Sequence, residues 1–314
     1  MFSNLLALYD LSPASLTALK WTLKLGERFR SRVHVLHVLE RGAKTSQSEE
    51  ISCVIRTDID KELRKISQES PGGRLEKIDV QVSPGRPVTE ILKTIEVRRP
   101  DLVVVGTHGR TGLKHVLLGS VAEKIVRHSP APTLVAREII AWPPKKMVLP
   151  IDIFESSEES LAFAQEFRRF LPVAVSGLYV VEPPVSVMVS PEMMSVPIPI
   201  VDEKTLRKEA EAKFREVSGG HPSFPMETSV VVGPAADQIC RAARESQADM
   251  IIMPSHGRKG LSRLLMGSVA EQVVRYAPCS VLTYHPEKTA RARRESLAEI
   301  GVSPENDKEL GGGD

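Results

Sequence analysis

Apolar runs of strand length alternate with amphipathic stretches along the whole chain, and the series occurs twice. A short run of Val, Ile and Leu bounded by turn residues is typical of a buried strand, whereas apolar residues three or four positions apart indicate a helix. In the first half this pattern predicts strands at 4–10, 32–39, 78–82, 102–106 and 133–136, a polar loop at 40–48, and helices from Ser12 and Pro13, over about 51–67, over 87–97 and from Ser120.

The second half repeats the same order of elements. Its expected strands are 147–152, 173–181, 228–232, 250–254 and 280–284, and its expected helices begin at Ser156 and Ser268 or cover about 202–217 and 235–246. Strands without polar alternation, each followed by a helix, predict parallel sheets covered on both faces. Because such crossovers are right-handed, we expect an α/β fold of two tandem flavodoxin- or Rossmann-like domains, each with a five-stranded doubly wound sheet.

These elements divide the chain into 1–137, a linker at 138–146, a second domain at 147–285 and a charged tail at 286–314. The second half also contains a Met- and Pro-rich insertion at 183–203. Two interpretations of the insertion stay open. It is a long surface loop packed on its own domain, or it is a lid or partner-binding surface.

Composition and charge exclude little beyond two classes of partner. The 42 basic and 40 acidic residues are well mixed, which argues against nucleic acid and membrane partners. Three cysteines without metal-ligand spacing are expected to be buried, reduced thiols. No basic and apolar leader begins the sequence, so we expect a cytoplasmic protein.

The clearest chemical signal is a repeated glycine loop. Residues 106–130 return 148 positions later with 14 of 25 identities. The loop leads from a buried strand into a helix, an arrangement that can hold a phosphate on backbone N–H groups. A second interpretation is purely structural: Ser120 with Glu123, and Ser268 with Glu271, are spaced as capping boxes that serve only their helices.

Several better-known chemistries are disfavoured by the residues around this loop. There is no P-loop signature, no G-x-G-x-x-G after the first strand and no nucleophile at catalytic spacing from a histidine. His108, His115 and His256 have no acidic or cysteine partner at metal spacing, so hydrogen bonding within the loop is expected. Four cations are candidate phosphate neighbours, or are simply solvated: Arg110, Lys114, Arg258 and Arg263.

The motif G-x2-G-x9-G-[ST] after the fourth strand, the Asp that ends the first strand, the L-H-V second strand and the helix S-V-A-E-x-[IV]-V-R-x-[SA]-P resemble the universal stress protein family. The likeness covers the chain twice, from Asn4 to Ala136 and from Lys146 to Tyr284. It implies a strand order of 3-2-1-4-5 in each half and ATP binding in some members. Mg²⁺ would enter only with the nucleotide, since no protein metal site is expected.

The resemblance assigns a nucleotide site to each half. In the first half, Leu8, Tyr9, Asp10 and Val38 would line the adenosine, and Val105, Gly106, Gly109, Gly119, Ser120 and Val121 would hold ribose and phosphates. The weaker second site would comprise Asp152, Val180, Met253, Gly257, Gly267, Ser268 and Val269. Here Pro254 replaces the equivalent of Gly106. If Gly106 supplies an amide donor, the second site is impaired; if it serves only close packing, both sites fill.

The main functional hypothesis is an ATP-binding stress-response regulatory or sensing module, without efficient catalysis. The alternatives are a nucleotide-independent scaffold with degenerate sites and an adenine-nucleotide enzyme. Each half ends in a short edge strand, so we expect the halves to pair as an intramolecular pseudo-dimer through 133–136 and 280–284. A further homodimer of the whole chain rests on the resemblance alone.

Overall fold

The computed structural model describes residues 2–40, 45–69, 78–108, 118–139, 142–152, 157–182, 203–219, 226–255 and 266–285. Nearly all of the insertion at 183–203, the whole of the tail at 286–314, and the loop glycines Gly109 and Gly257 lie outside these ranges. The predictions made for those segments therefore concern residues that the structure does not describe.

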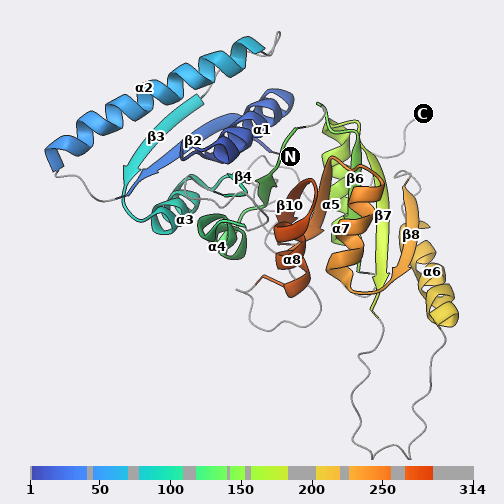
Figure 1. Cartoon of the computed structure of the whole chain (residues 1–314). Coiled ribbons are helices and arrows are strands. Elements are labelled where there is room, and N and C mark those ends of the chain that lie inside the picture. The colour runs from blue at the N-terminus through green and yellow to red at the C-terminus, as the bar shows by residue number, and fades with distance from the viewer. Residues whose placement is uncertain are drawn as a thin grey trace, which may run out of the picture.

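Ten strands form one sheet in the order β3-β2-β1-β4-β5-β10-β9-β6-β7-β8 (Figure 1). The first half contributes β1 (Asn4–Leu8), β2 (Arg32–Leu39), β3 (Ile78–Pro84), β4 (Leu102–Gly106) and β5 (Thr133–Ala136). The second half contributes β6 (Lys146–Pro150), β7 (Ala174–Val181), β8 (Glu227–Val232), β9 (Met250–Pro254) and β10 (Ser280–Tyr284). Within each half all pairings are parallel and the order is 3-2-1-4-5, which confirms the predicted fold.

Helices cover both faces of this sheet. One layer contains α1 (Pro13–Phe29), α2 (Thr45–Glu69), α5 (Ser157–Phe170) and α6 (Glu203–Gly219), and the other contains α3 (Pro87–Arg98), α4 (Ser120–His128), α7 (Ala235–Glu245) and α8 (Ser268–Tyr276). Side chains alternate along β1 between the two layers. Leu5 and Ala7 belong to the core under α1, whereas Leu6 and Leu8 belong to the core under α4.

The two halves join through their last strands. β5 pairs with β10 in antiparallel register, with Val135 opposite Val281, as the short edge strands predicted. On the α1 and α5 face the junction is aromatic: the Phe29 ring of α1 lies with its centroid 4.9 Å from that of Phe170 and 6.3 Å from that of Phe167, both on α5. One hydrophobic core therefore continues from the first half into the second.

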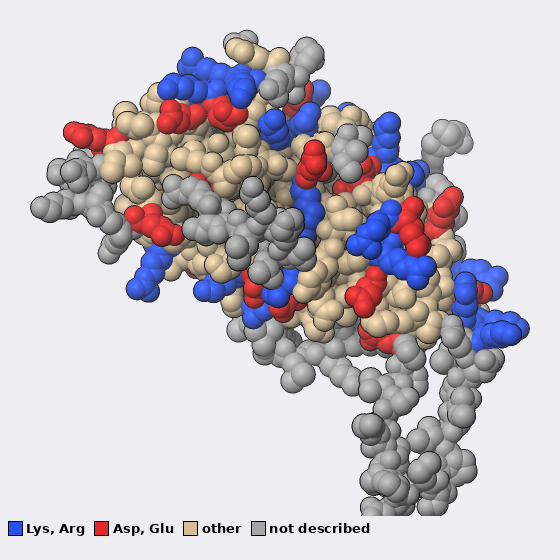
Figure 2. Space-filling model, viewed as in Figure 1, with Lys and Arg blue, Asp and Glu red and all other residues tan. Residues whose placement is uncertain are grey.

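Two expectations need correction. Helix α2 begins at Thr45, inside the segment predicted as a loop at 40–48. Its first turns consist of polar residues, and the apolar spacing that predicts a helix starts only at Ile51. Cys53 is exposed on this helix, whereas Cys240 and Cys279 are buried as expected, and all three are free. Basic and acidic side chains are interspersed over the visible surface, in keeping with the mixed composition (Figure 2).

Candidate functional site

The loop after β1 is held by hydrogen bonds to both the backbone and the side chain of Asp10. The Asp10 Oδ1 atom accepts from the Ser12 N–H at 3.0 Å, and the Asp10 N–H donates to Ser15 Oγ at 3.2 Å. Ser12 caps helix α1, since its Oγ accepts from the Ser15 N–H at 3.1 Å. Leu11, between Asp10 and Ser12, has a φ of 68°, a left-handed conformation that residues other than glycine rarely adopt. The loop is thus built tightly around the Asp10 carboxylate.

The carbonyl end of β1 is anchored from β2. The ring of His37, which is buried, lies with Nδ1 2.8 Å from the Tyr9 carbonyl oxygen, and the Tyr9 N–H donates to the Leu36 carbonyl at 3.0 Å. Burial, and then the nearby Glu62 carboxylate, raise the pKa of the Tyr9 phenol. Because Leu8 pairs with Leu36 in the sheet, Val38 follows at the level of Asp10. These residues therefore lie at one end of the sheet.

Gly106, at the end of β4, allows the closest approach in this region. A Cβ atom there would lie 2.6 Å from the carbonyl carbon and oxygen of Ala14 and 2.9 Å from the Ser15 nitrogen. The first turn of α1 therefore packs directly on the backbone of β4. This close packing leaves no room for a side chain at position 106 and accounts for the glycine there. The equivalent turn of the second half, 153–156, lies outside the described residues, so this contact of Gly106 has no described counterpart at Pro254.

The other end of the glycine loop is closed by a backbone hydrogen bond. The Gly119 N–H donates to the Thr107 carbonyl at 2.7 Å, and Gly119 itself is the N-cap of α4 in an extended conformation. No side chain caps this helix among the residues described. The capping box predicted for Ser120 and Glu123 is therefore wrong. With the cap at Gly119, Ser120 becomes the first helical residue. The Glu123 carboxylate instead pairs with Arg127 and Arg275.

The two helix starts near β1 and β4 therefore differ in chemistry. Helix α1 satisfies its first turn with Ser12 and Ser15, whereas α4 presents the N–H groups of Ser120, Val121 and Ala122 without a side-chain acceptor in the described structure. β1 and β4 are neighbours at the point where the strand order reverses, where α/β sheets bind ligands. The predicted residues of the first half that are described all belong to this end of the sheet.

The second half repeats the frame of the site. The Ile151 N–H donates to the Leu178 carbonyl at 2.9 Å, as Tyr9 does to Leu36, and the Gly267 N–H donates to the Ser255 carbonyl at 2.8 Å. Gly267 caps α8, again without a side-chain acceptor in the described part, so the capping box of Ser268 and Glu271 is also wrong. Three further predicted residues are in the strands and helix around this frame, and a fourth follows β6: Val180, Met253 and Val269, with Asp152 after the strand.

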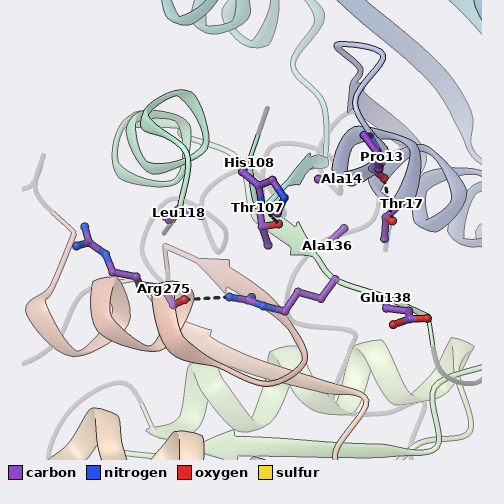
Figure 3. Close-up of a pocket in the computed structure, with 10 residues that line it drawn as sticks. Pro13, Ala14, Thr17, Thr107, His108, Leu118, Ala136, Glu138 and Arg275 are labelled. Atoms are coloured by element: carbon purple, nitrogen blue, oxygen red, sulfur yellow. Dashed lines mark hydrogen bonds between the residues drawn. The ribbon is translucent and has the colours of Figure 1, made fainter. Parts of the chain in front are cut away.

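A cavity of about 370 Å³ lies beside the first glycine loop, at the junction of the halves (Figure 3). Its walls are Pro13, Ala14, Thr17, Thr107, His108, Leu118, Ala136, Arg137, Glu138 and Arg275. None of the site residues predicted from the sequence lines it. Its walls come from both halves, so the cavity forms only once β5 has paired with β10.

Arg137 secures this junction. Its guanidinium donates to the carbonyls of Cys279, Val274 and Arg275 at 3.3, 2.9 and 3.2 Å, and the last of these bonds is dashed in Figure 3. The Arg137 carbonyl in turn accepts from Trp21 Nε1 at 2.9 Å. A cation that meets the carbonyl end of a helix is favourably placed. Arg137, which ends the first predicted domain, thus binds the last turn of α8.

Helices α4 and α8 also meet through four charged side chains, Glu123, Arg127, Glu271 and Arg275, which we call the seam tetrad. Arg127 Nη2 lies 3.2 Å from Glu123 Oε1 and 3.1 Å from Glu271 Oε2. Arg275 Nη2 lies 3.5 Å from Glu123 Oε2 and 3.4 Å from Glu271 Oε1. Each arginine therefore bridges a glutamate of its own helix and one of the other half. The glutamates of the expected capping boxes are used here.

The histidine of the first glycine loop that the structure describes, His108, hydrogen-bonds to its neighbour. His108 Nδ1 lies 2.9 Å from Thr107 Oγ1, which confirms the expected loop hydrogen bond, whereas His115 and His256 lie outside the described residues. Within the described ranges no group of three or more His, Cys, Asp or Glu side chains could hold a metal ion.

In the same ranges, no helix has the length and apolar character needed to cross a bilayer.

The fold and the site together define a tandem α/β protein with a glycine loop at the reversal point of each half-sheet. A model of the universal stress protein family matches residues 1–137 and 144–285, and the chain belongs to this family. A universal stress protein of Methanocaldococcus jannaschii is 31% identical over 134 residues, which cover 41% of this chain and 78% of that protein. One from Mycobacterium tuberculosis is 28% identical over 192 residues, 58% of this chain and 61% of that protein, less than two thirds of its length.

Solved structures show the same fold over nearly the whole chain. A universal stress protein from Archaeoglobus fulgidus has a TM-score of 0.65 at 18% identity and covers 90% of this chain and 98% of that one. A protein of unknown function from Pseudomonas aeruginosa has a TM-score of 0.66 at 17% identity, with coverage of 95% and 98%. At these identities the likeness concerns the fold.

Proposed function

We propose that this universal stress protein is a regulatory module that binds ATP at the carboxyl ends of β1 and β4. The observation that carries the proposal is the start of α4, where three N–H groups have no side-chain acceptor in the described structure. The neighbouring start of α1 is capped by the Ser12 side chain, which accepts from the Ser15 N–H. Backbone N–H groups at a helix start bind phosphate through hydrogen bonds and the helix dipole.

The adenosine end of the ligand would lie against the loop of Asp10. The Ser12 N–H and the Ser15 hydroxyl hold that loop, and Val38 and Leu8 supply apolar surface beside it. The Asp10 carboxylate suits a ribose hydroxyl better than a phosphate, because two anions repel each other. Mg²⁺ would arrive with the nucleotide.

A regulatory role is proposed instead of catalysis. Among the residues of the proposed site that the structure describes, no serine, cysteine or carboxylate is hydrogen-bonded to a histidine in the arrangement that activates a nucleophile. The three free cysteines fit a reducing compartment, and we propose the cytoplasm. The protein would then respond to nucleotide level through its bound state.

Calorimetric titration of the full chain with ATP tests the proposal. Gly119→Val should lower the affinity of the first site by about tenfold or more, because a branched side chain enters the space between the helix start and the phosphate. The backbone of Gly119, at φ −63° and ψ 145°, accommodates valine. Gly267→Val, at the equivalent position in the second half, is the matched control and should leave the first site unchanged.

Two results would contradict the proposal. An absence of binding at millimolar ATP in the parent protein would favour the nucleotide-independent scaffold. Unchanged affinity in a folded Gly119→Val variant would remove the glycine loop from the site. Circular dichroism of both variants shows that the fold is retained.

A further inference from the structure

The two glutamates of the seam tetrad lie close to the proposed phosphate site at the start of α4 and to the equivalent start of α8 in the second half. Glu123 is in the first turn of α4 and Glu271 is in the first turn of α8. With a rise of about 1.5 Å per residue, each glutamate starts within about 5 Å, along the helix axis, of the first N–H group. Side chains on a helix also lean toward its N-terminus. Each carboxylate is therefore within electrostatic reach of a phosphate bound at its helix.

An unpaired carboxylate at this position would oppose binding. In general, a partly exposed negative charge about one Debye length from a phosphate, roughly 8–10 Å at physiological salt, lowers the affinity by about three- to tenfold. The tetrad removes this penalty because two arginines balance two glutamates. For Glu123, one of the two neutralising arginines is Arg275, which belongs to the second half.

A second observation places Arg275 near the first glycine loop. Arg275 lines the junction cavity together with Thr107, His108 and Leu118, and Leu118 directly precedes the N-cap Gly119 (Figure 3). Its carbonyl accepts a hydrogen bond from Arg137, which fixes the last turn of α8 against the first half. The position of Arg275 therefore depends on the junction and not on α8 alone.

We propose that each half completes the phosphate site of the other: Arg275 supports the site on α4, and Arg127 supports the site on α8. The inference rests on the proposed nucleotide function and adds a specificity-determining residue from the opposite half. Neither half alone would then have its full affinity for an anionic ligand. The two sites become electrostatically linked, since Arg127 and Arg275 each contact both glutamates.

A purely structural role of the tetrad makes a different prediction. The four side chains are 27–31% exposed, and ion pairs at such exposure contribute little to stability, about 0–1 kcal/mol. If they only hold the halves together, removing a glutamate and removing an arginine both weaken the junction, and any change in affinity has the same direction in both variants. If they set the charge beneath the phosphate, the two removals change affinity in opposite directions.

The test is calorimetric titration of the full chain with ATP at low and high salt. We expect Arg275→Gln to weaken binding at the first site by about three- to tenfold and Glu123→Gln to strengthen it by a similar factor. The double variant should return close to the parent, and Arg275→Lys should retain most of the affinity. Arg241→Gln, which breaks the exposed pair with Glu245 on α7, is the matched control and should change nothing. All differences should shrink at high salt.

Each outcome decides a separate statement. Absence of ATP binding in the parent overturns the proposed function itself. Binding in the parent that is unchanged in Arg275→Gln, or that changes in the same direction in Glu123→Gln, overturns only the cross-half role of the tetrad. If Arg275→Gln unfolds, the sign of the change in Glu123→Gln and the charge-retaining Arg275→Lys still decide the question.

Discussion

Replacing Gly106 by alanine tests the close approach of α1 to β4. The added Cβ would lie 2.6 Å from two backbone atoms of Ala14 and 2.9 Å from the Ser15 nitrogen. An ordinary contact between such atoms is about 3.5 Å, so the first turn of α1 must move by roughly 0.9 Å. These atoms belong to a helix backbone in a packed core and cannot move aside as a flexible side chain can.

Overpacking of this kind costs about 1–3 kcal/mol, and we expect the upper part of the range for a clash with backbone. With a urea m-value of about 2 kcal/mol/M, the unfolding midpoint should fall by about 1 M at an unchanged slope. ATP affinity should fall as well, because the displaced turn carries Ser12 and Ser15, which hold the Asp10 loop.

The control is Pro254→Ala, at the equivalent position of the second half. Proline there is already larger than glycine, so alanine adds no atom, and the midpoint should change by less than about 0.5 M. Urea unfolding followed by circular dichroism measures both variants. A Gly106→Ala protein with the midpoint of the parent would refute the packing argument.

Three further predictions concern the junction and the titratable groups. Arg137→Met should lower the free energy of unfolding by about 2–4 kcal/mol, since three carbonyls lose a charged donor; an unchanged urea midpoint would contradict this. Burial lowers the pKa of His34, so the unfolded chain binds a proton that the folded chain resists, and stability should fall as the pH drops below 6.5. His34→Phe should show a smaller loss in urea titrations between pH 7 and 5, and an equal loss would argue against it. Burial raises the pKa of the Cys279 thiol to about 12, so iodoacetamide should modify the exposed Cys53 and spare Cys279, as peptide mass mapping can show.

Local pattern alone determined the elements and their order. Val and Ile runs such as 102–106 and 250–254 became β4 and β9 because a strand buried on both faces must be apolar throughout. The pattern was least informative where polar residues form a helix, as in the first turns of α2, since polar turns carry no apolar spacing. The short last strands also indicated how the halves pair, because an open sheet edge needs a partner.

Tertiary structure decided what several of the same residues do. The spacing of Ser120 and Glu123 fits a capping box, and the spacing of Glu123 and Arg127 fits an ion pair within one helix. The side chains of Glu123 and Arg127 also form ion pairs with α8. Sequence spacing reports neighbours along one helix, whereas a contact between residues 152 apart exists only once β5 and β10 have paired. For the same reason the sequence left two roles open for Gly106, a ligand contact or close packing, and its packing against Ala14 became visible only when α1 and β4 were placed together.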